Sequence, residues 1–281
     1  MCIDLHIHSH YSDGTFSPAR LVKIASASHL HGISLTDHDT VEGTEEFLEE
    51  AKKVNIQAIT GLEISSTHRE YSLHLLGYGI NHQDGKLRKW LARLQQGRKT
   101  RNEQILAKMQ KLGLDIHMAE LDTLSCCGQT GRPHIARLLV QKRIVSSVND
   151  AFRHYLRKGS AAWVSRFTYS ADLSIAMIHQ AGGLAVLAHP GQITPQPMSL
   201  PLLIGELVER GLDGIEIYYP GYSPKVRRGL SGLAARHKLF ITGGSDYHGD
   251  NNSYSRMAGK KNGFCPPDSL LDQLIEKIGV F

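Results

Sequence analysis

Four short segments place histidine, aspartate and glutamate at the ends of apolar runs that are typical of buried strands. These segments are Asp4-Leu5-His6-Ile7-His8-Ser9, Thr36-Asp37-His38-Asp39, Gly61-Leu62-Glu63-Ile64 and Ser245-Asp246-Tyr247-His248. Alternate side chains of a strand share a face, so His6 and His8 should point into one site, as should Asp246 and His248. Imidazole and carboxylate ligands together suit manganese, iron or zinc, and the segments hold more ligands than one ion can use. The pattern predicts a multinuclear catalytic metal centre.

Composition places the chain among ordinary globular proteins. It has 281 residues, of which 41% are hydrophobic and 21% charged. Two of its four cysteines, Cys126 and Cys127, are adjacent, and none forms a CxxC pair with another. We therefore expect a chain that folds without disulfides in a reducing cytoplasm. It shows no export signal and no run of about 18 apolar residues, so no membrane insertion is expected, and no protein partner is inferred.

Charge is distributed unevenly along the chain. Residues 85–166 carry 17 Lys and Arg against 5 Asp and Glu, whereas the rest carries 15 against 22. A basic segment in an otherwise acidic protein favours a surface for phosphates. The alternative is a set of solvated helix faces with Lys and Arg on their outer sides.

Hydrophobic periodicity predicts alternating strands and helices at both ends of the chain. Expected strands are residues 3–8, 33–36, 57–63, 72–80, 184–188, 214–218 and 239–242, and expected helices are residues 18–28, 41–53 and 171–180. Metal-type residues at strand ends are typical of barrel-like α/β folds. Residues 85–166 have helical periodicity instead, with helices around 133–141 and 148–158. We therefore predict a catalytic barrel formed by residues 1–84 and 167–281, with a basic helical cap inserted at 85–166.

The order of the metal-type residues resembles the PHP (polymerase and histidinol phosphatase) superfamily. A matching residue stands at each of nine family ligand positions: His6, His8, Asp13, His38, Glu63, His74, His189, Asp246 and His248. The resemblance implies a distorted (β/α)7 barrel with three metal ions. It also implies that His6, His8, Glu63 and Asp246 hold one ion, Asp13, His38 and His248 a second, and Glu63, His74 and His189 a third, with Glu63 bridging.

The inserted segment resembles one branch of this superfamily in particular. Its run Gly131-Arg132-Pro133-His134-Ile135-Ala136-Arg137 resembles the cap of the bacterial branch that contains RNase AM and 3′,5′-nucleoside bisphosphate phosphatases. Arg132 and Arg137 bracket a predicted helix start, where free amides and His134 favour phosphate. The alternative is that these cations dock the cap on the acidic barrel. One departure is Gln192, which stands where relatives often place arginine.

Several charged residues lie beside these motifs or elsewhere in the basic segment. Asp4, Asp37 and Asp39 flank ligands, and we expect them either to orient imidazoles or to cap turns. Arg98 and Arg101 are weaker phosphate candidates that we interpret as solvated helix residues.

Phosphoester hydrolysis is the reaction that fits this set. We expect a metal-bridging hydroxide to attack phosphorus in line while Arg132, His134 and Arg137 hold the phosphate. The leaving oxygen would take its proton from His8, His248 or a metal-bound water. A cap favours chain ends or small nucleotides, so the expected substrates are 3′,5′-nucleoside bisphosphates and short RNA, attacked as a phosphatase or a 5′-3′ exoribonuclease. Manganese is the expected ion, with iron or zinc as alternatives.

Two other functions compete with this hypothesis. A phosphomonoesterase of the histidinol phosphatase type would differ chiefly in the cap, and the basic Gly-Arg-Pro-His run favours nucleotides over it. A non-catalytic nucleic-acid-binding protein would be expected to have lost one or more ligands, and none is lost here.

Overall fold

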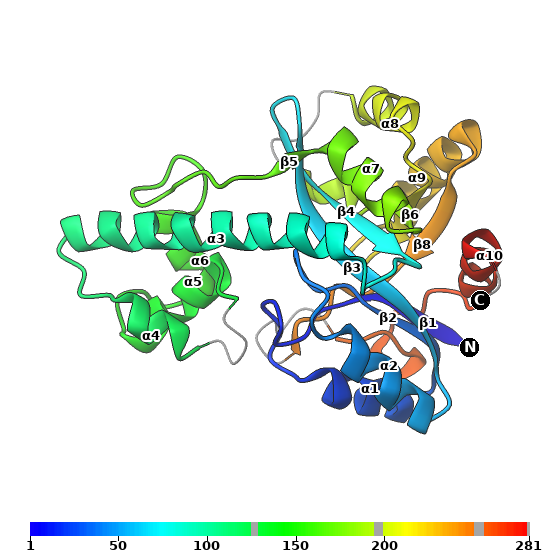
Figure 1. Cartoon of the computed structure of the whole chain (residues 1–281), viewed down its shortest axis with the longest axis horizontal. Helices are drawn as coiled ribbons and strands as arrows, with labels where there is room; N and C mark the ends of the chain where they lie inside the picture. Colours follow the sequence, from blue (N-terminus) through cyan, green and yellow to red (C-terminus); the bar gives the residue numbers. More distant parts are fainter. Residues whose placement is uncertain (125–128, 194–198, 250–255, 280–281) are drawn as a thin grey trace.

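A single curled sheet forms the centre of the chain in a computed structural model that describes residues 1–124, 129–193, 199–249 and 256–279 (Figure 1). Its strands are β1 (Cys2–Ile7), β2 (Leu30–Leu35), β3 (Gln57–His68), β4 (Tyr71–Tyr78), β5 (Tyr169–Ser170), β6 (Leu184–Leu187), β7 (Gly214–Tyr218) and β8 (Phe240–Gly243). They follow the order β1-β2-β3-β4-β6-β7-β8, with β5 beside β3. Neighbours are parallel except for the pairs β3-β4 and β4-β6.

The two edges of the sheet meet. Ile7 forms a parallel bridge with Tyr247, beyond the end of β8, and the His8 amide donates to the Tyr247 carbonyl at 2.9 Å. Gly244 lies so close to β1 that an added Cβ would stand 2.3 Å from the His6 Cβ. The α/β class is confirmed, and the curled sheet is consistent with the predicted barrel.

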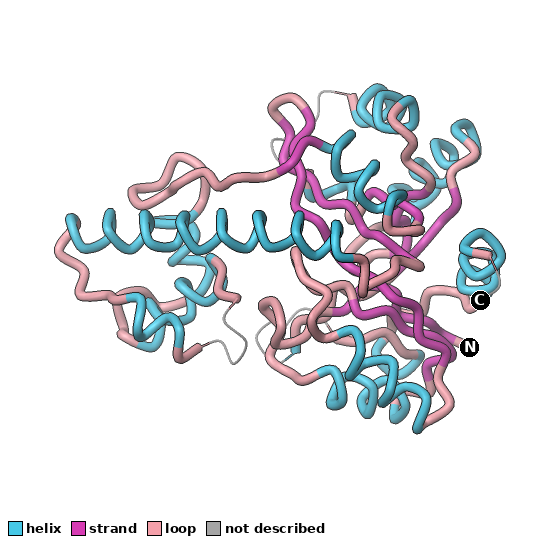
Figure 2. The backbone as a smooth tube through the Cα atoms, viewed as in Figure 1, coloured by secondary structure: helices cyan, strands magenta, loops and turns pink. Residues whose placement is uncertain are grey.

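Helices surround the strands (Figure 2). They are α1 (Pro18–Ala27), α2 (Thr44–Lys53), α7 (Ala171–Gln180), α8 (Leu200–Glu209), α9 (Pro224–His237) and α10 (Ser269–Ile278). Serine and proline start three of them: Ser17, Ser199 and Ser223 each accept a first-turn amide. Helices α8, α9 and α10 were not expected from the sequence.

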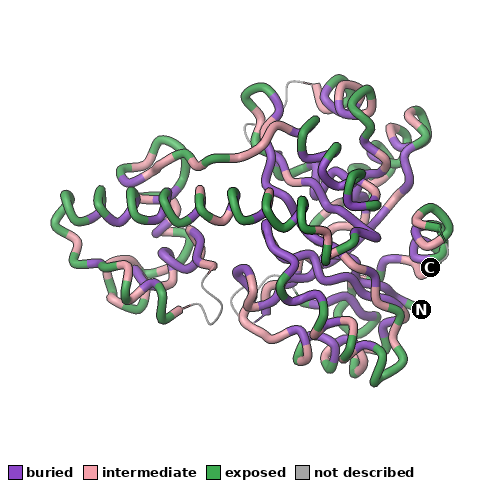
Figure 3. Tube along the Cα trace, viewed as in Figure 1, coloured by how far each residue is buried: buried purple, intermediate pink, exposed green. Residues whose placement is uncertain are grey.

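The strands carry the core, and burial is concentrated along them (Figure 3). Every residue of β1 is buried, because Ile3 and Leu5 face one cluster and Ile7 faces another. One predicted strand is longer than expected: β3 continues to His68 and pairs as a hairpin with β4, which presents His74 opposite Ser65. At this point of the chain, two consecutive strands pair directly, without the helix that would connect two parallel strands.

A long helix, α3 (Gly85–Lys111), leads out of the sheet region (Figure 1). Asp84 caps it by accepting the amides of Lys86 and Leu87 at 2.8 Å. Its first turns pack into the barrel-side core through Leu87, Leu91 and Leu94. Its later turns form a separate cluster with α4 (Met118–Asp122), α5 (Arg132–Gln141), α6 (Val148–Ala151) and the π-helical turn Phe152–Leu156. The predicted helix at 148–158 is therefore a short α-helix followed by a π turn.

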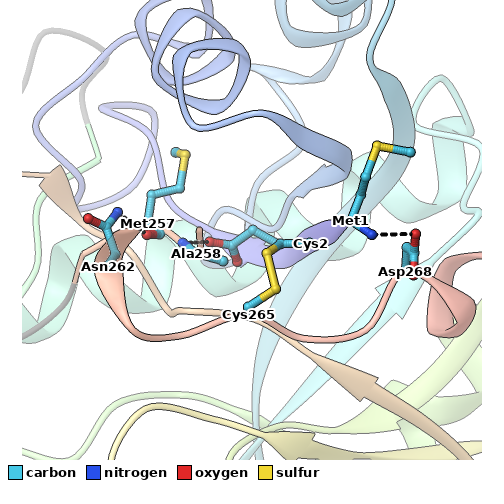
Figure 4. Close-up of a disulfide and its surroundings, with 8 residues drawn as sticks. Met1, Cys2, Met257, Ala258, Asn262, Cys265 and Asp268 are labelled. Carbon is cyan, nitrogen blue, oxygen red and sulfur yellow. Dashed lines mark hydrogen bonds and ion pairs between the residues drawn. A yellow bond between two sulfur atoms is a disulfide. The ribbon is translucent and has the colours of Figure 1, made fainter. Parts of the chain in front are cut away.

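The expectation of a chain without disulfides is wrong. Cys2, at the start of β1, is bonded to Cys265, 263 positions later in the sequence, which ties the first strand to the segment before α10 (Figure 4). The N-terminal amine reinforces this tie through an ion pair with Asp268 at 2.7 Å. Adjacent cysteines and CxxC pairs can be recognised in the sequence. The bond between Cys2 and Cys265 forms because the fold brings two distant segments together. Cys126 and Cys127 lie outside the described residues.

Within the described ranges, no helix combines the length and the apolar character that crossing a bilayer requires.

Candidate metal centre

The structure brings all nine predicted ligand positions together in one cluster. His6 lies in β1 and His8 directly after it, His38 follows β2, and Glu63 and His74 lie in the β3-β4 hairpin. The remaining members, Asp13, His189, Asp246 and His248, come from loops that follow β1, β6 and β8. Alternation along β1 directs His6 and His8 to the same side, as predicted, with ring centroids 5.1 Å apart.

Glu63 stands at the centre of the cluster and is fully buried. Its Oε1 lies 2.8 Å from His74 Nδ1 and 2.9 Å from His189 Nε2, while its Oε2 lies 2.8 Å from His38 Nδ1. His6 and His8 approach the same Oε2 at 3.4 and 3.3 Å. Burial opposes ionisation of Glu63, but the surrounding imidazoles outweigh it and hold the pKa well below its usual value. This carboxylate is therefore an anion shared by five histidines.

Two further carboxylates extend the cluster on either side. Asp13 Oδ1 lies 3.2 Å from His248 Nε2 and 3.9 Å from His38 Nε2. Asp246 Oδ1 lies 3.1 Å from His8 Nε2 and 3.5 Å from His6 Nε2. Asp13 is buried and Asp246 is partly buried, and although burial opposes their ionisation, neighbouring histidines hold both pKa values well below the ordinary range. His38 therefore connects Glu63 and Asp13 through its two ring nitrogens.

Possible ligand atoms fall into three groups, each within 4.8 Å. The groups are His8-Asp13-His38-His248, His6-His8-Glu63-Asp246 and His38-Glu63-His74. The second coincides with one ion site implied by the resemblance. The first adds His8 to the expected trio, and the third has His38 where the resemblance places His189. The assignment of each ligand to an ion stays a prediction.

The cluster has the polar atoms that a metal requires. Several of the close contacts above are ion-pair distances without hydrogen-bond geometry: among the described residues, His6 Nε2, Asp13 Oδ1, His38 Nδ1, Glu63 Oε2 and both nitrogens of His8 are buried and form no hydrogen bond. Buried polar atoms normally have partners, so these atoms need one that the protein does not supply. Neutral nitrogens and anionic oxygens together are the donor set of divalent transition metals. The residues present therefore fit divalent ions.

Two neighbouring histidines of the cluster, His8 and His248, have pKa values shifted in opposite directions. The His8 and His248 rings stack with centroids 4.1 Å apart. Burial lowers the pKa of His8 to about 3, assisted by the charges of His248 and His38. Burial also disfavours the His248 cation, but Asp13 and Asp246 overcome it and raise that pKa to about 10. Participation of either ring in proton transfer stays a prediction.

Of the three flanking aspartates, Asp4 and Asp37 hold loops and Asp39 binds arginines, and among the described residues none of them forms a hydrogen bond with an imidazole. Asp4, within β1, accepts from the Ser245 amide and hydroxyl at 2.8 and 2.6 Å, which joins β1 to the loop after β8. Asp37 accepts the Ser9 amide at 2.7 Å and the Ser12 hydroxyl at 2.5 Å. Each one fixes a ligand-bearing loop.

Two residues that orient ligands were missed from the sequence. Glu216, in the middle of β7, lies 3.0 Å from His6 Nδ1 and accepts the His189 amide at 2.8 Å. Its signal was a carboxylate in the apolar strand Gly214–Tyr218, which is unusual for a residue that is fully buried. The Tyr219 hydroxyl donates a hydrogen bond to Asp246 Oδ2 at 2.8 Å and accepts one from Gln192 Nε2 at 2.6 Å. Such contacts orient metal ligands.

The basic start of α5 reaches the cluster from the cap side. Arg137 Nη2 donates to the Asp13 carbonyl at 3.3 Å. His134 is buried, and its Nδ1 accepts the Gly131 amide at 3.1 Å. Burial, with the charge of Arg137, lowers the His134 pKa to about 4, so this ring is neutral. Arg132 instead donates to the Leu156 carbonyl at 3.3 Å, away from Asp13.

Arg98 and Arg101 contradict their interpretation as solvated residues. Their exposed fractions are only 8% and 4%. Arg98 Nη2 donates to Asp39 Oδ2 at 2.5 Å, and Arg166 Nη1 donates to the same oxygen at 3.0 Å. Helical periodicity did not reveal this burial, because elements distant in the sequence, such as the segment after β2 that carries Asp39, cover this polar part of α3.

Comparison with known proteins gives a consistent result. The PHP domain family matches residues 4–157. The 5′-3′ exoribonuclease Rnm of Escherichia coli (strain K12) is 31% identical over 247 residues, covering 87% of this chain and 84% of its own. The 3′,5′-nucleoside bisphosphate phosphatase of Chromobacterium violaceum is 32% identical over 250 residues, covering 88% and 87%.

A solved structure extends the likeness to the whole fold. A Bifidobacterium adolescentis protein, itself proposed to be a metal-dependent phosphoesterase, superposes with a TM-score of 0.90 and 28% identity, covering 99% of this chain and 96% of its own.

Proposed function

Because the chain belongs to the PHP family and is a metal-dependent hydrolase, we propose that it hydrolyses phosphoesters of nucleotides. The substrates are 3′,5′-nucleoside bisphosphates, which lose the 3′-phosphate, and short RNA, degraded from its 5′ end. The observation that carries this proposal is the approach of α5 to the metal cluster, where Arg137 donates to the Asp13 carbonyl at 3.3 Å. The names of the E. coli and C. violaceum relatives support the same substrates.

The metal set of this proposal consists of the nine clustered residues, His6, His8, Asp13, His38, Glu63, His74, His189, Asp246 and His248. We propose three ions, with manganese as the first choice and Glu63 as the shared ligand. Bound divalent ions would supply a nucleophile at neutral pH and neutralise charge on the phosphoryl oxygens.

Residues of the cap complete the phosphate site. The His134 Nδ1 accepts the Gly131 amide, so in the neutral ring the proton resides on Nε2, which can donate to a phosphate oxygen. Arg137 adds a fixed cation beside Asp13, and a guanidinium matches phosphate oxygens in geometry. Arg132 belongs to the same basic helix start. Because the Arg132 guanidinium donates to the Leu156 carbonyl instead, His134 and Arg137 would hold the reacting phosphate against the metals, while a cap made of residues 85–166 excludes long internal stretches of polymer.

Location follows from the substrates. Nucleotides and short RNA are intracellular, which supports the cytoplasm as the site of action. The Cys2–Cys265 bond is one that a reducing cytoplasm would disfavour, so its state in freshly isolated protein bears directly on this assignment.

The test compares three substrates with manganese-loaded protein: adenosine 3′,5′-bisphosphate, a 5′-phosphorylated short RNA and histidinol phosphate. We expect phosphate release from the first and mononucleotide release from the second. The substitution His38→Ala should abolish both, while His154→Ala, which changes an exposed histidine outside the cluster, should leave them intact. Hydrolysis of histidinol phosphate alone would refute the nucleotide assignment.

A further inference from the structure

Two tyrosines, Tyr219 and Tyr222, lie beside the metal centre on the segment that follows β7. Their ring centroids are 5.3 Å apart, and the Tyr219 ring lies 5.6 Å from the ring of His189. The Tyr219 hydroxyl also donates to Asp246 Oδ2 at 2.8 Å. A row of three aromatic rings therefore begins at the predicted metal ligands and ends at Tyr222.

The tyrosine pair is held in place by the segment after β6. The Tyr222 hydroxyl accepts the Gly191 amide, and the Tyr219 hydroxyl accepts Gln192 Nε2, both at 2.6 Å. An added Cβ at Gly191 would lie 2.8 Å from the Tyr222 hydroxyl oxygen, so a residue without a side chain is needed for this approach. Tyr222 packs partly on the barrel core, yet both tyrosines are only half-buried. Fixed, partly exposed rings are suited to stacking with a planar group.

The start of α9 adds positive charge next to the tyrosine pair. This helix begins two residues after Tyr222, and its first turn contains no acidic residue. Lys225 and Arg228 are exposed there, and the Arg227 guanidinium lies 5.9 Å from the centroid of the Tyr218 ring. Aromatic rings interleaved with cations are typical of surfaces that bind single-stranded nucleic acid.

The tyrosine pair and the cap occupy different parts of the rim around the metal centre. Arg137 of the cap meets the loop after β1 at Asp13, and Arg98 meets Asp39 after β2. In the strand order, β6 and β7 are separated from β1 and β2 by β3 and β4 in one direction and by β8 in the other. Figure 1 shows α4, α5 and α6 of the cap on the left and α9, which follows Tyr222, on the right.

The two proposed substrates differ in one group. In both reactions the bond between phosphorus and the 3′-oxygen breaks, and water supplies a hydroxyl group to phosphorus and a proton to the 3′-oxygen. A 3′,5′-nucleoside bisphosphate carries nothing further on the reacting phosphate. In RNA the same phosphate is esterified to the 5′-oxygen of a second nucleoside, which needs a place beside the metal centre that the cap does not fill.

We infer that Tyr219 and Tyr222 form a subsite for this second nucleoside, whose base stacks on the exposed part of the pair. The inference rests on the proposed function and deepens it, because the subsite serves RNA and not the bisphosphate. Stacking on aromatic side chains accepts any base, as degradation of RNA from one end requires. Lys225 and Arg228 would then lie near the phosphates that follow.

The first test compares 5′-phosphorylated diadenylate with adenosine 3′,5′-bisphosphate, using manganese-loaded protein. We expect Tyr222→Ala to lower the ratio of their kcat/KM values by about fivefold or more, as for the loss of one stacked base. Tyr222→Phe keeps the ring and should keep most of the ratio. Tyr71→Ala, which changes a half-buried tyrosine of β4, should leave it unchanged. The ratio cancels any effect of a variant on metal loading or folded fraction, because both substrates share it.

The second test removes the base instead of the ring. The substrate is a 5′-phosphorylated dinucleotide whose second residue is an abasic ribose, so the phosphodiester is retained. In the wild type, we expect kcat/KM to fall by about the same factor that Tyr222→Ala causes with diadenylate. In Tyr222→Ala, removal of the base should have little further effect, because ring and base form one interaction. The wild-type measurement does not depend on the folding of any variant.

Three results would overturn the inference while leaving the proposed function intact. They are equal losses on both substrates in Tyr222→Ala, a wild type that is indifferent to the second base, and losses from ring and base that simply add. In each case the bisphosphate is still hydrolysed by the wild type. If the wild type hydrolyses neither diadenylate nor the bisphosphate, the proposed function is refuted and the subsite with it.

Discussion

Replacing Asp39 by asparagine should destabilise the junction between barrel and cap more than any nearby polar substitution. The carboxylate is fully buried, and its Oδ2 accepts from Arg98 at 2.5 Å and from Arg166 at 3.0 Å, while Oδ1 accepts the Ser65 amide at 2.9 Å. Asparagine keeps one acceptor for Ser65 but presents an amide donor to two guanidinium groups. Two charge-assisted hydrogen bonds are lost, and the arginines stay buried without a counter-ion.

The magnitude follows from these contacts. Hydrogen bonds to charged groups contribute about 1.5 to 3 kcal/mol each, and breaking a buried ion pair from one side costs about 3 to 5 kcal/mol. We expect Asp39→Asn to lower the free energy of unfolding by about 3 to 5 kcal/mol. In a chain of this size that corresponds to a drop in melting temperature of roughly 6 to 10 °C. The control Asp122→Asn changes an exposed aspartate of the cap and should cost less than about 0.5 kcal/mol.

The pH dependence of stability gives a second test of Asp39. Burial opposes its ionisation, but Arg166 and Arg98 hold the pKa of Asp39 below its ordinary value. The stabilisation is therefore complete above the unfolded pKa of about 4 and is lost as the pH falls below it toward the folded pKa. Thermal melts from pH 7 to pH 3 should show the gap between wild type and Asp39→Asn narrowing at the acid end. A variant within about 1 kcal/mol of the wild type at pH 7, or a gap that widens in acid, would refute the reasoning.

Three further outcomes are expected. Glu63→Gln removes the anion shared by five imidazoles and should abolish phosphoesterase activity and lower the bound metal per chain, measured by elemental analysis; unchanged metal content would contradict the central role of this carboxylate. Tyr219→Phe removes the hydroxyl that donates to Asp246 at 2.8 Å and should weaken manganese binding by about 10- to 100-fold in a titration; an unchanged affinity would show that the hydroxyl does not orient the ligand. Peptide mapping without reduction should find the Cys2 and Cys265 peptides joined, and their separate recovery would count against this bond.

The nine ligand positions came from the family resemblance, and the structure brings these residues together because they lie in or after neighbouring strands of one curled sheet. His6 and His8 followed from alternation alone, and the positions of the strands were close to those observed. The residues that orient the ligands were harder to find. Glu216 and Tyr219 reach the site through the packing of β7 beside β6 and β8; the carboxylate within an apolar strand marks Glu216 as unusual, but the local sequence does not show which ligand it contacts.

The junction residues show a different limit of sequence reasoning. Charge and helical spacing made Arg98 and Arg101 resemble solvated residues, because periodicity separates apolar from polar faces but does not show what covers a polar face. The covering elements are Asp39 after β2, the start of α5 and the segment before β5. Likewise, Cys2 and Cys265 are far apart in sequence and become neighbours only when the last segment packs on β1.

The most direct test of the central claim is phosphate release from adenosine 3′,5′-bisphosphate before chelation, after complete removal of metal, and after manganese is restored, with metal content measured at each step. We predict that release disappears with the metal, returns with it, and never appears in His38→Ala. Release that persists in metal-free protein, or that stays absent when the nine-residue cluster is loaded with manganese, would contradict the account.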